Sequence, residues 1–197
     1  MIIVKKESEQ TIPFSQLQEW TGALYRPYLQ FSSQRLLRAI AAKSERLKRG
    51  GELGAEQLWL GNYFQKEFVE PPMPFVSLRW IDDRMGWGVF AEEPIGSMSF
   101  IAEYTGLVRK RKGSDRTNAY CFEYLLTPWL PTRYVIDAQD QGGLSRYINH
   151  SEDPNLTSAL ATHEGIPHVI LYAKRPIAKN EELRYDYGID YWKHRKR

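Results

Sequence analysis

From Phe75 onward, short runs rich in β-branched and aromatic residues follow one another, and this succession constrains the fold more than any other feature of the sequence. The runs are FVSLRWI, WGVFA, SFIAEYTGLV, AYCFEYLL, RYVIDA, HVILYA and ELRYDYG. Turn signals such as Gly96 and the pair Asp153 and Pro154 separate them. No long helical repeat lies between the runs, so parallel βαβ units are not expected. The pattern predicts a mostly β domain of small antiparallel sheets over residues 75–192.

The preceding residues, 1–74, are predicted to form a helical N-terminal region. Apolar residues recur at helical spacing between Ser33 and Arg49, at Leu36, Leu37, Ile40 and Leu47. Gly50 and Gly51 are expected to end this helix. A second short helix or turn is expected in AEQLWLGNYFQKEF, before EPPMP breaks the chain. The whole chain is therefore predicted to be α+β, with a basic tail at residues 193–197.

Composition is typical of a globular protein. Hydrophobic residues make up 42% and charged residues 26% of a chain of 197 residues, which is long enough to bury a core. The single cysteine, Cys121, excludes an internal disulfide and a cysteine-rich zinc cluster. No apolar stretch has the length of a signal peptide or a membrane span. We therefore expect a cytosolic-type protein without a membrane partner, or one secreted into a host cell without a cleavable signal and nuclear there.

The stretch GLSRYINHSEDPNL places three polar side chains, Asn149, His150 and Ser151, directly after an apolar and aromatic pair. A Ser/His nucleophile, a metal site and a binding loop compete as explanations. Adjacent strand residues point to opposite faces, so His150 and Ser151 are badly placed for each other. The four histidines have no short ligand spacing, which disfavours a metal. A binding loop fits better, although a capped loop whose Asn149 and Ser151 bond turn amides explains this stretch equally well when it is taken alone.

Three further stretches accompany it in order: RMGWGVFA at 84–91, FIAEYTG at 100–106 and EELRYDYG at 181–188. Together with RYINHSEDPNL they resemble the SET domain of protein lysine methyltransferases. The resemblance covers Val76 to Trp192, and the ending YDYGIDYWKHRKR is similar to that of bacterial, chlamydial-type SET proteins. It implies the SET-domain fold, in which a pseudo-knot brings residues near 150 and near 187 together. Residues 1–74 match no part of the pattern.

The resemblance implies S-adenosylmethionine as methyl donor, S-adenosylhomocysteine as product, and no metal. The implied cofactor-binding residues are Met85, Gly86, Trp87, Gly88, Tyr120, Asn149 and His150. The glycines among them would let the backbone approach the cofactor closely. The implied catalytic residues are Tyr187, Tyr104 and Tyr185, of which the last two line the lysine channel. Because little of the chain follows Gly188, the channel is expected to be completed either by Tyr191 and Trp192 as an aromatic lid or by another chain.

The implied function is that of a protein-lysine N-methyltransferase acting on histones or other basic DNA-associated proteins, with mainly mono- and some dimethylation expected from Tyr185. A groove that attracts a basic tail is expected from acidic residues, namely Asp82, Asp83, Glu92, Glu93, Glu152 and Asp153. Weak contact with nucleosomes or DNA is expected through the basic runs, Arg109–Lys112 or the tail Lys193–Arg197 above all. Two alternatives stay open: an inactive SET-fold module that binds peptide or chromatin, and a nucleic-acid-binding protein that works through its N-terminal helix. No oligomeric state is predicted.

Overall fold

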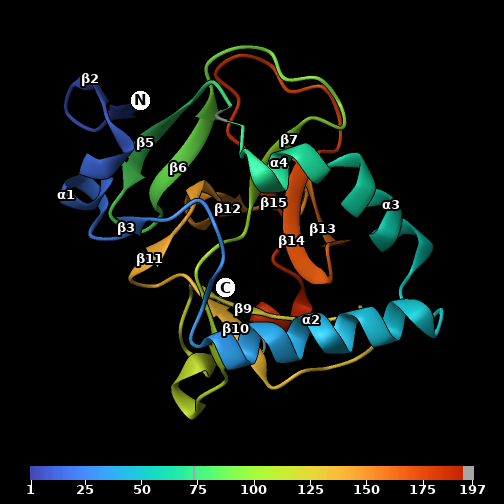
Figure 1. The fold of residues 1–197 in the computed structure, drawn as a ribbon. Helices are drawn as coiled ribbons and strands as arrows, with labels where there is room; N and C mark the ends of the chain where they lie inside the picture. Colours follow the sequence, from blue (N-terminus) through green and yellow to red (C-terminus); the bar gives the residue numbers. More distant parts are fainter. Residues whose placement is uncertain (73, 193–197) are drawn as a thin grey trace.

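The computed structural model describes residues 1–72 and 74–192, and its architecture is mostly β with strands in small sheets, as predicted (Figure 1). One four-stranded sheet has the order β2 (Glu9–Ile12), β1 (Ile2–Lys5), β5 (Val76–Asp82) and β6 (Gly86–Ala91). The other four-stranded sheet has the order β4 (Gln30–Phe31), β8 (Leu107–Lys110), β10 (Tyr134–Asp137) and β9 (Cys121–Glu123). A three-stranded sheet has the order β13 (Leu156–His163), β14 (Ile166–Ala173) and β7 (Phe100–Glu103). Two short pairs join β11 (Gln141–Gly142) to β3 (Leu24–Tyr25) and β12 (Asn149–His150) to β15 (Arg184–Tyr185).

Helices surround these sheets. The α-helices are α1 (Leu17–Thr21), α2 (Gln34–Arg49), α3 (Ala55–Tyr63), α4 (Gln65–Val69) and α5 (Ile189–Trp192). Single 3₁₀ turns occur at η1 (Phe14–Gln16), η2 (Gly113–Arg116) and η3 (Leu144–Tyr147). Among the described residues, no helix is both long and apolar enough to cross a membrane.

Every predicted β run contains a strand, but the long strand β13 and several two- to four-residue strands lie outside those runs. The run SFIAEYTGLV divides into β7 and β8 around Gly106, where a Cβ would lie 2.5 Å from the Asp137 carbonyl oxygen. Strand β13 was not predicted, because LTSALATH has no Val, Ile, Phe, Tyr or Trp, and two threonines are its only β-branched residues. It pairs antiparallel with β14 over its whole length, and a Glu164–Gly165 turn with positive φ at both residues joins the two strands.

The prediction that residues 1–74 form a helical region is wrong in one respect, because four short strands accompany its helices. β1 pairs in parallel with β5, β3 with β11 and β4 with β8. These pairs connect segments far apart in sequence, and strands of two to four residues carry little local pattern of their own. The N-terminal region is therefore built into the sheets of the remaining chain.

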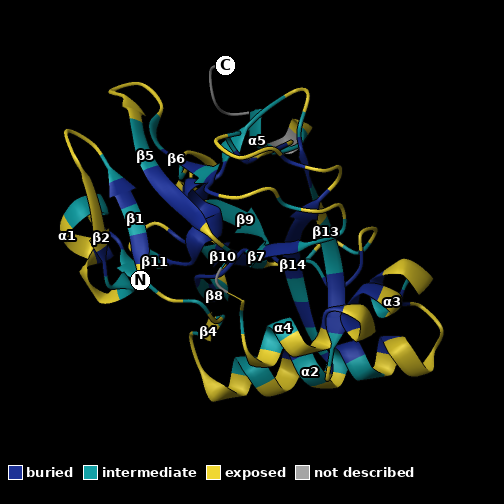
Figure 2. Ribbon diagram, turned by 90° about the horizontal axis from the view of Figure 1, so that it is seen from above, coloured by how far each residue is buried: buried dark blue, intermediate teal, exposed yellow. Residues whose placement is uncertain are grey.

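The main predicted helix is present as α2. Ser33 caps it, its Oγ accepting a hydrogen bond from the Leu36 N–H at 3.1 Å. Ile40, Ser44 and Leu47 are buried and face the sheets, while the outer edge of the helix is exposed (Figure 2). The second predicted helix is present as α3 and α4.

Two acidic residues expected in a substrate groove have structural roles instead. Glu92 is only 9% exposed and forms ion pairs with Arg79 at 2.9 Å and Lys5 at 3.2 Å. Burial opposes ionisation of Glu92, but hydrogen bonds from Ser77, Arg79 and Lys5 outweigh it and lower the pKa of the carboxyl group to about 2. This cluster holds β1 against β5 and β6.

Asp82 closes the turn between β5 and β6. Its Oδ1 accepts hydrogen bonds from the backbone N–H groups of Arg84 at 2.8 Å and Met85 at 2.6 Å. The prediction of an acidic groove is therefore wrong for Glu92, which is buried in ion pairs, whereas Asp82 is exposed and uses its Oδ1 within the turn.

Two arginines of the basic run Arg109–Lys112 are neutralised by ion pairs within the chain. Arg109 is bound to Asp115 at 2.6 Å and Asp137 at 2.7 Å, and Arg111 to Glu123 at 2.9 Å. Arg109 is thus not available to bind nucleic acid. The second predicted DNA contact, Lys193–Arg197, lies outside the described residues.

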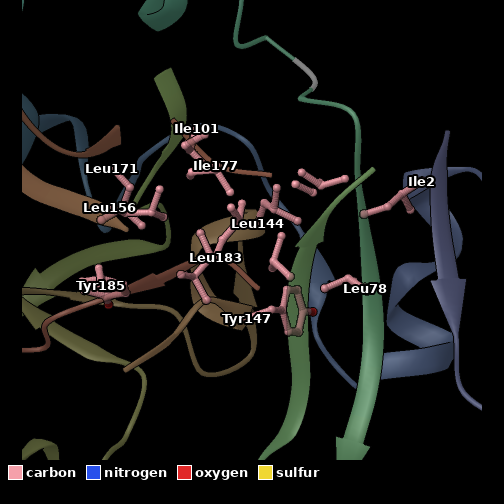
Figure 3. Close-up of a cluster of buried hydrophobic side chains, with 14 of the residues drawn as sticks. Ile2, Leu78, Ile101, Leu144, Tyr147, Leu156, Leu171, Ile177, Leu183 and Tyr185 are labelled. Atoms are coloured by element: carbon pink, nitrogen blue, oxygen red, sulfur yellow. The ribbon is translucent and has the colours of Figure 1, made fainter. Parts of the chain in front are cut away.

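The largest apolar core lies between the first sheet and the β12–β15 pair. Figure 3 shows side chains from β1, β5, β7, β13, β14 and η3 meeting there, with Tyr147 and Tyr185 in the same cluster. Both tyrosines also line a cavity, so the core supports its wall directly.

Candidate functional site

The β12–β15 crossing brings together two motifs that are more than thirty residues apart in sequence. Asn149 pairs with Arg184 and His150 with Tyr185, in parallel. Beyond the pair, the Tyr187 N–H donates to Nδ1 of His150 at 3.2 Å, and the Tyr187 hydroxyl donates to the Ile148 carbonyl oxygen at 2.9 Å. The predicted proximity of residues near 150 and near 187 is confirmed.

A cavity of about 590 Å³ opens beside this crossing. Its volume is in the range of small-molecule sites. The predicted site residues in its wall are Met85, Gly86, Trp87, Tyr104, Tyr120, Asn149, Tyr185, Tyr187 and Tyr191. The structure thus brings together residues from all the stretches that carry the resemblance. Gly88, His150 and Trp192 do not line the cavity.

Asn149 is held by its amide nitrogen. Nδ2 donates to Oε1 of Glu182 at 2.9 Å and to the Trp87 carbonyl oxygen at 3.3 Å, so the side chain ties β6 to the segment before β15. Among the described residues, none donates to its Oδ1. Because Asn149 lines the cavity, this oxygen is available as an acceptor for a ligand amino group.

The two glycines of the Met85–Gly88 stretch are required for different reasons. Gly86 has a φ of 72°, a backbone conformation that side chains rarely adopt, and it borders the cavity. At Gly88, a Cβ would lie 2.8 Å from Cδ1 of Ile81 and 3.0 Å from Oε1 of Glu182. The expected close approach to a ligand therefore applies to Gly86, whereas Gly88 makes room for the Glu182 carboxylate that holds Asn149.

Four tyrosines form one end of the cavity. The Tyr187 ring centroid lies 4.8 Å from that of Tyr185 and 4.6 Å from that of Tyr191. The hydroxyl of Tyr104 donates to the Tyr120 carbonyl oxygen at 3.0 Å. By contrast, the hydroxyl of Tyr185 makes no hydrogen bond to any described residue, although Tyr185 lines the cavity.

These hydroxyl groups are neutral at physiological pH. Burial raises the pKa of Tyr104, Tyr185 and Tyr187 far above the ordinary value of 10.0, and neighbouring tyrosines raise it further. Burial likewise raises the pKa of the Cys121 thiol, which also lines the cavity, to about 12. The cavity therefore offers apolar walls and hydroxyl dipoles, and neither a phenolate base nor a thiolate nucleophile.

His150 and Ser151 do not form a nucleophilic pair. Nδ1 of His150 accepts the Tyr187 N–H, and Oγ of Ser151 accepts the Asp153 N–H at 3.1 Å. The His150 ring packs against both Tyr187 and Trp192, at centroid distances of 5.4 and 5.0 Å. Its position supports the loop around Tyr187, in agreement with the rejection of a Ser/His base.

Helix α5 carries the residues expected to act as an aromatic lid. Trp192 stacks on Tyr187 with a centroid distance of 6.4 Å and an interplanar angle of 16°. Tyr191 lies in the cavity wall, whereas Trp192 lies behind Tyr187. Whether this pair closes a substrate channel stays a prediction.

Part of the wall was not foreseen. Lys6, Trp20 and Thr21 reach the cavity from the N-terminal region. The Thr21 hydroxyl lies 2.7 Å from that of Tyr147, and the Trp20 and Trp87 rings meet edge to face at 6.5 Å. No local signal in the sequence could have found these residues, because they reach the site through the parallel pairing of β1 with β5 and of β3 with β11.

Arg146 was also missed, although it lies inside the quoted motif. Its guanidinium sits 4.3 Å from the Tyr120 ring and 4.7 Å from the Tyr147 ring, and it donates to the Ala138 and Gln139 carbonyl oxygens. A buried arginine between two aromatic residues fixes this side of the cavity. The sequence signal that could have identified Arg146 as a site residue was its position beside Tyr147 in this motif.

The SET domain family model matches residues 86–188, which is more than half of the chain. The chain belongs to the SET-domain family. Its residues 86–188 contain all of β6 to β15, and with them most of the cavity wall.

Fungal proteins are among the relatives of this SET domain. Histone-lysine N-methyltransferases described as H3 lysine-4 specific are 41% identical in Chaetomium globosum, 40% in Neurospora crassa and 37% in Candida albicans, each over 108 residues. The match covers 53% of this chain and 10%, 8% and 10% of those proteins, so the chain spans about a tenth of their length. The expected similarity to bacterial proteins is not shown by these relatives.

A solved structure is also similar. It is the crystal structure of KRYPTONITE in complex with mCHH DNA, an H3(1-15) peptide and SAH, with 31% sequence identity and a TM-score of 0.49. The match covers 60% of this chain and 25% of that chain.

Proposed function

We propose that the protein is an S-adenosylmethionine-dependent protein-lysine N-methyltransferase whose active site is the cavity beside the β12–β15 crossing. The observation that carries the proposal is the cluster of neutral tyrosines, Tyr104, Tyr185 and Tyr187, in one wall with Asn149 and Gly86. Membership in the SET-domain family supports it. So do the relatives, which are named as histone-lysine N-methyltransferases.

The residues of the cavity fit the proposed methyl donor. Oδ1 of Asn149 can accept from an amino group, Gly86 leaves its backbone uncovered, and a volume of about 590 Å³ holds a nucleoside joined to an amino acid. When bound, S-adenosylmethionine supplies a methyl group on a positively charged sulfur. Arg84, which lines the same cavity, offers a cation for a carboxylate.

The tyrosine end suits a lysine amine as the nucleophile. A free lysine has a pKa of about 10.4, so the attacking neutral form is rare in water. Apolar walls made of tyrosine rings disfavour the ammonium and favour the neutral amine. The Tyr187 hydroxyl is fixed by the Ile148 carbonyl oxygen and can orient the amine lone pair toward the methyl group. As the N–C bond forms the S–C bond breaks, and the excess proton on nitrogen leaves to solvent.

Methylation assays on basic proteins test the proposal. Core histones, small basic DNA-binding proteins and the protein itself are incubated separately with S-adenosylmethionine, and mass spectrometry then maps any added methyl groups. We expect lysine methylation of at least one basic substrate. Cofactor binding in calorimetry without methylation of any substrate would favour an inactive binding module. Absence of cofactor binding would contradict the proposed site.

Asn149→Ala is expected to weaken cofactor binding. The change removes the acceptor for the ligand amino group and leaves the Glu182 carboxylate and the Trp87 carbonyl oxygen without this donor. We expect a loss of about 1–3 kcal/mol, or roughly 5- to 150-fold in Kd, measured by calorimetry. Asn155→Ala is the control, because Asn155 bonds the same segment through Glu181, Glu182 and Arg184 but lies outside the cavity wall. It should lower Tm while leaving Kd nearly unchanged, and equal Kd values for Asn149→Ala and the parent would contradict the binding role.

Tyr185 is expected to limit the number of methyl groups added. Its unbonded hydroxyl faces the cavity and can hold a water molecule beside the lysine amine. A second transfer requires that water to leave, which opposes the step by about 1–2 kcal/mol, or roughly 5- to 30-fold in rate. The parent should therefore give mainly monomethyl product with some dimethyl. Tyr185→Phe should shift it toward di- and trimethyl-lysine.

Time-resolved mass spectrometry on one peptide measures this shift. Tyr104→Phe is the matched control, because the Tyr104 hydroxyl is already bound to the Tyr120 carbonyl oxygen and should not hold such a water. Processive trimethylation by the parent would show that Tyr185 has no such role.

A further inference from the structure

Helix α2 presents a stripe of arginines on the face turned away from the sheets. The buried side of the helix is defined by Ile40, Ser44 and Leu47. The arginines of the stripe are exposed, and at ~3.6 residues per turn they lie within ~80° of one another around the axis: Arg35, Arg38, Arg46 and Arg49. Figure 2 shows the outer edge of α2 free of other elements over its length.

The arginines of the stripe differ from arginines elsewhere in the chain that are neutralised by ion pairs. These paired arginines are Arg79, Arg109, Arg111, Arg175 and Arg184. None of the four stripe arginines forms an ion pair with a described residue. Glu45, the acidic residue within α2, is turned toward Gly165 in the β13–β14 turn. Positive charge on this face is therefore left uncompensated within the described part of the chain.

We infer that this stripe binds the phosphate backbone of double-stranded DNA. Arg35 with Arg38 and Arg46 with Arg49 form two pairs, which are ~16 Å apart along the axis at a rise of ~1.5 Å per residue. Because the major groove of B-DNA is ~12 Å wide, each pair can reach one of the two rows of phosphates that border it. Ala39 and Ala42 are exposed between the two pairs. Their small side chains keep the diameter of the helix low where it would cross the groove.

The choice of arginine also favours phosphates. Its planar guanidinium donates two parallel hydrogen bonds to phosphate oxygens and is only weakly hydrated. Four exposed cations with no large hydrophobic side chain between them suit a regular polyanion such as DNA. A protein partner normally requires buried aromatic or aliphatic contacts as well.

DNA bound here would not cover the proposed active site. In Figure 2, α2 and α5 lie on opposite sides of the sheets. The proposed active site borders α5 through Tyr191. DNA binding is therefore independent of the proposed methyltransferase activity, and its test does not depend on that activity.

Fluorescence anisotropy of a labelled DNA duplex, titrated with the full chain at several salt concentrations, tests the inference. The variant R35Q/R38Q/R46Q/R49Q should bind at least about tenfold more weakly at low salt. Each phosphate contact contributes ~0.9 to the slope of log K against log salt, so the slope should become shallower by ~3.6. The double variant R38Q/R46Q should show about half of this change in slope.

A charge-matched variant separates the stripe from overall charge. K66Q/R133Q/K174Q/K179Q removes the same number of exposed cations outside α2, and it should keep the salt slope of the parent. Tm should match the parent in all variants, which shows that they are folded. An unchanged slope in the α2 variant, or an equal loss in the charge-matched variant, would overturn the inference. So would tighter binding of the parent to duplex RNA or to polyglutamate than to DNA.

Discussion

Tyr187→Phe is expected to lower the rate of methyl transfer by roughly hundredfold or more while leaving the cofactor Kd within about threefold. The substitution keeps the ring, so contacts with Tyr185, Tyr191 and Trp192 are preserved. It removes only the hydroxyl, which the Ile148 carbonyl oxygen fixes at 2.9 Å. Since this hydroxyl is neutral, its expected effect is on orientation of the amine and not on proton removal. Single-turnover methylation and calorimetry on the same variant measure the two quantities.

Tyr147→Phe is the matched control for this experiment. Tyr147 lines the same cavity, and its hydroxyl also makes one hydrogen bond, to Thr21. The control should lose a comparable amount of stability but keep most of the transfer rate. If Tyr187→Phe transfers methyl at the parent rate, Tyr187 is not catalytic. If both variants lose activity equally, the loss is due to general loosening of the wall.

Gly61→Ala is expected to destabilise the fold by about 3 kcal/mol. In an exposed helix the same change stabilises by up to ~1 kcal/mol, because alanine has the higher helix propensity. Here the sign reverses, since a Cβ at Gly61 would lie 1.9 Å from the Thr162 carbonyl oxygen and 2.6 Å from its carbon. Those atoms are backbone atoms of β13 and cannot turn aside, so α3 must move away from the sheet. Denaturant unfolding of parent and variant measures the difference.

Gly113→Ala provides the comparison for Gly61→Ala. Gly113 starts η2, and a Cβ there would meet nothing within 4 Å. Its free energy of unfolding should stay close to that of the parent. A Gly61→Ala protein as stable as the parent would mean that α3 packs less closely on β13 than the structure indicates.

The parts of the site that could be predicted from the sequence are those in which local pattern and motif coincide. Strands β5, β6 and β10 carry apolar and β-branched residues that mark them without any partner. The meeting of His150 with Tyr187 could be predicted only from the resemblance, because no local rule relates segments separated by a whole hairpin. The roles of the individual site residues stay predictions until the variants are measured.

What could not be predicted depends on long-range neighbours. Gly88 is required by the Glu182 carboxylate, which comes close only after the strands have crossed. Glu92 was expected at the surface, but it is neutralised by ion pairs with Lys5, which is distant in sequence, and with Arg79 on β5. Charge counted along a sequence does not reveal such pairs, because their distances are set by sheet pairing.

The parallel pairing of β1 with β5, β3 with β11 and β4 with β8 has a further consequence for solubility. Each of these N-terminal strands satisfies a row of backbone N–H and C=O groups that would otherwise be a bare sheet edge. A fragment beginning at residue 75 would expose three such edges at once, and unpaired edges are templates for self-association. We therefore expect a fragment without the first 31 residues, which contain β1 to β4, to self-associate more readily than the full chain.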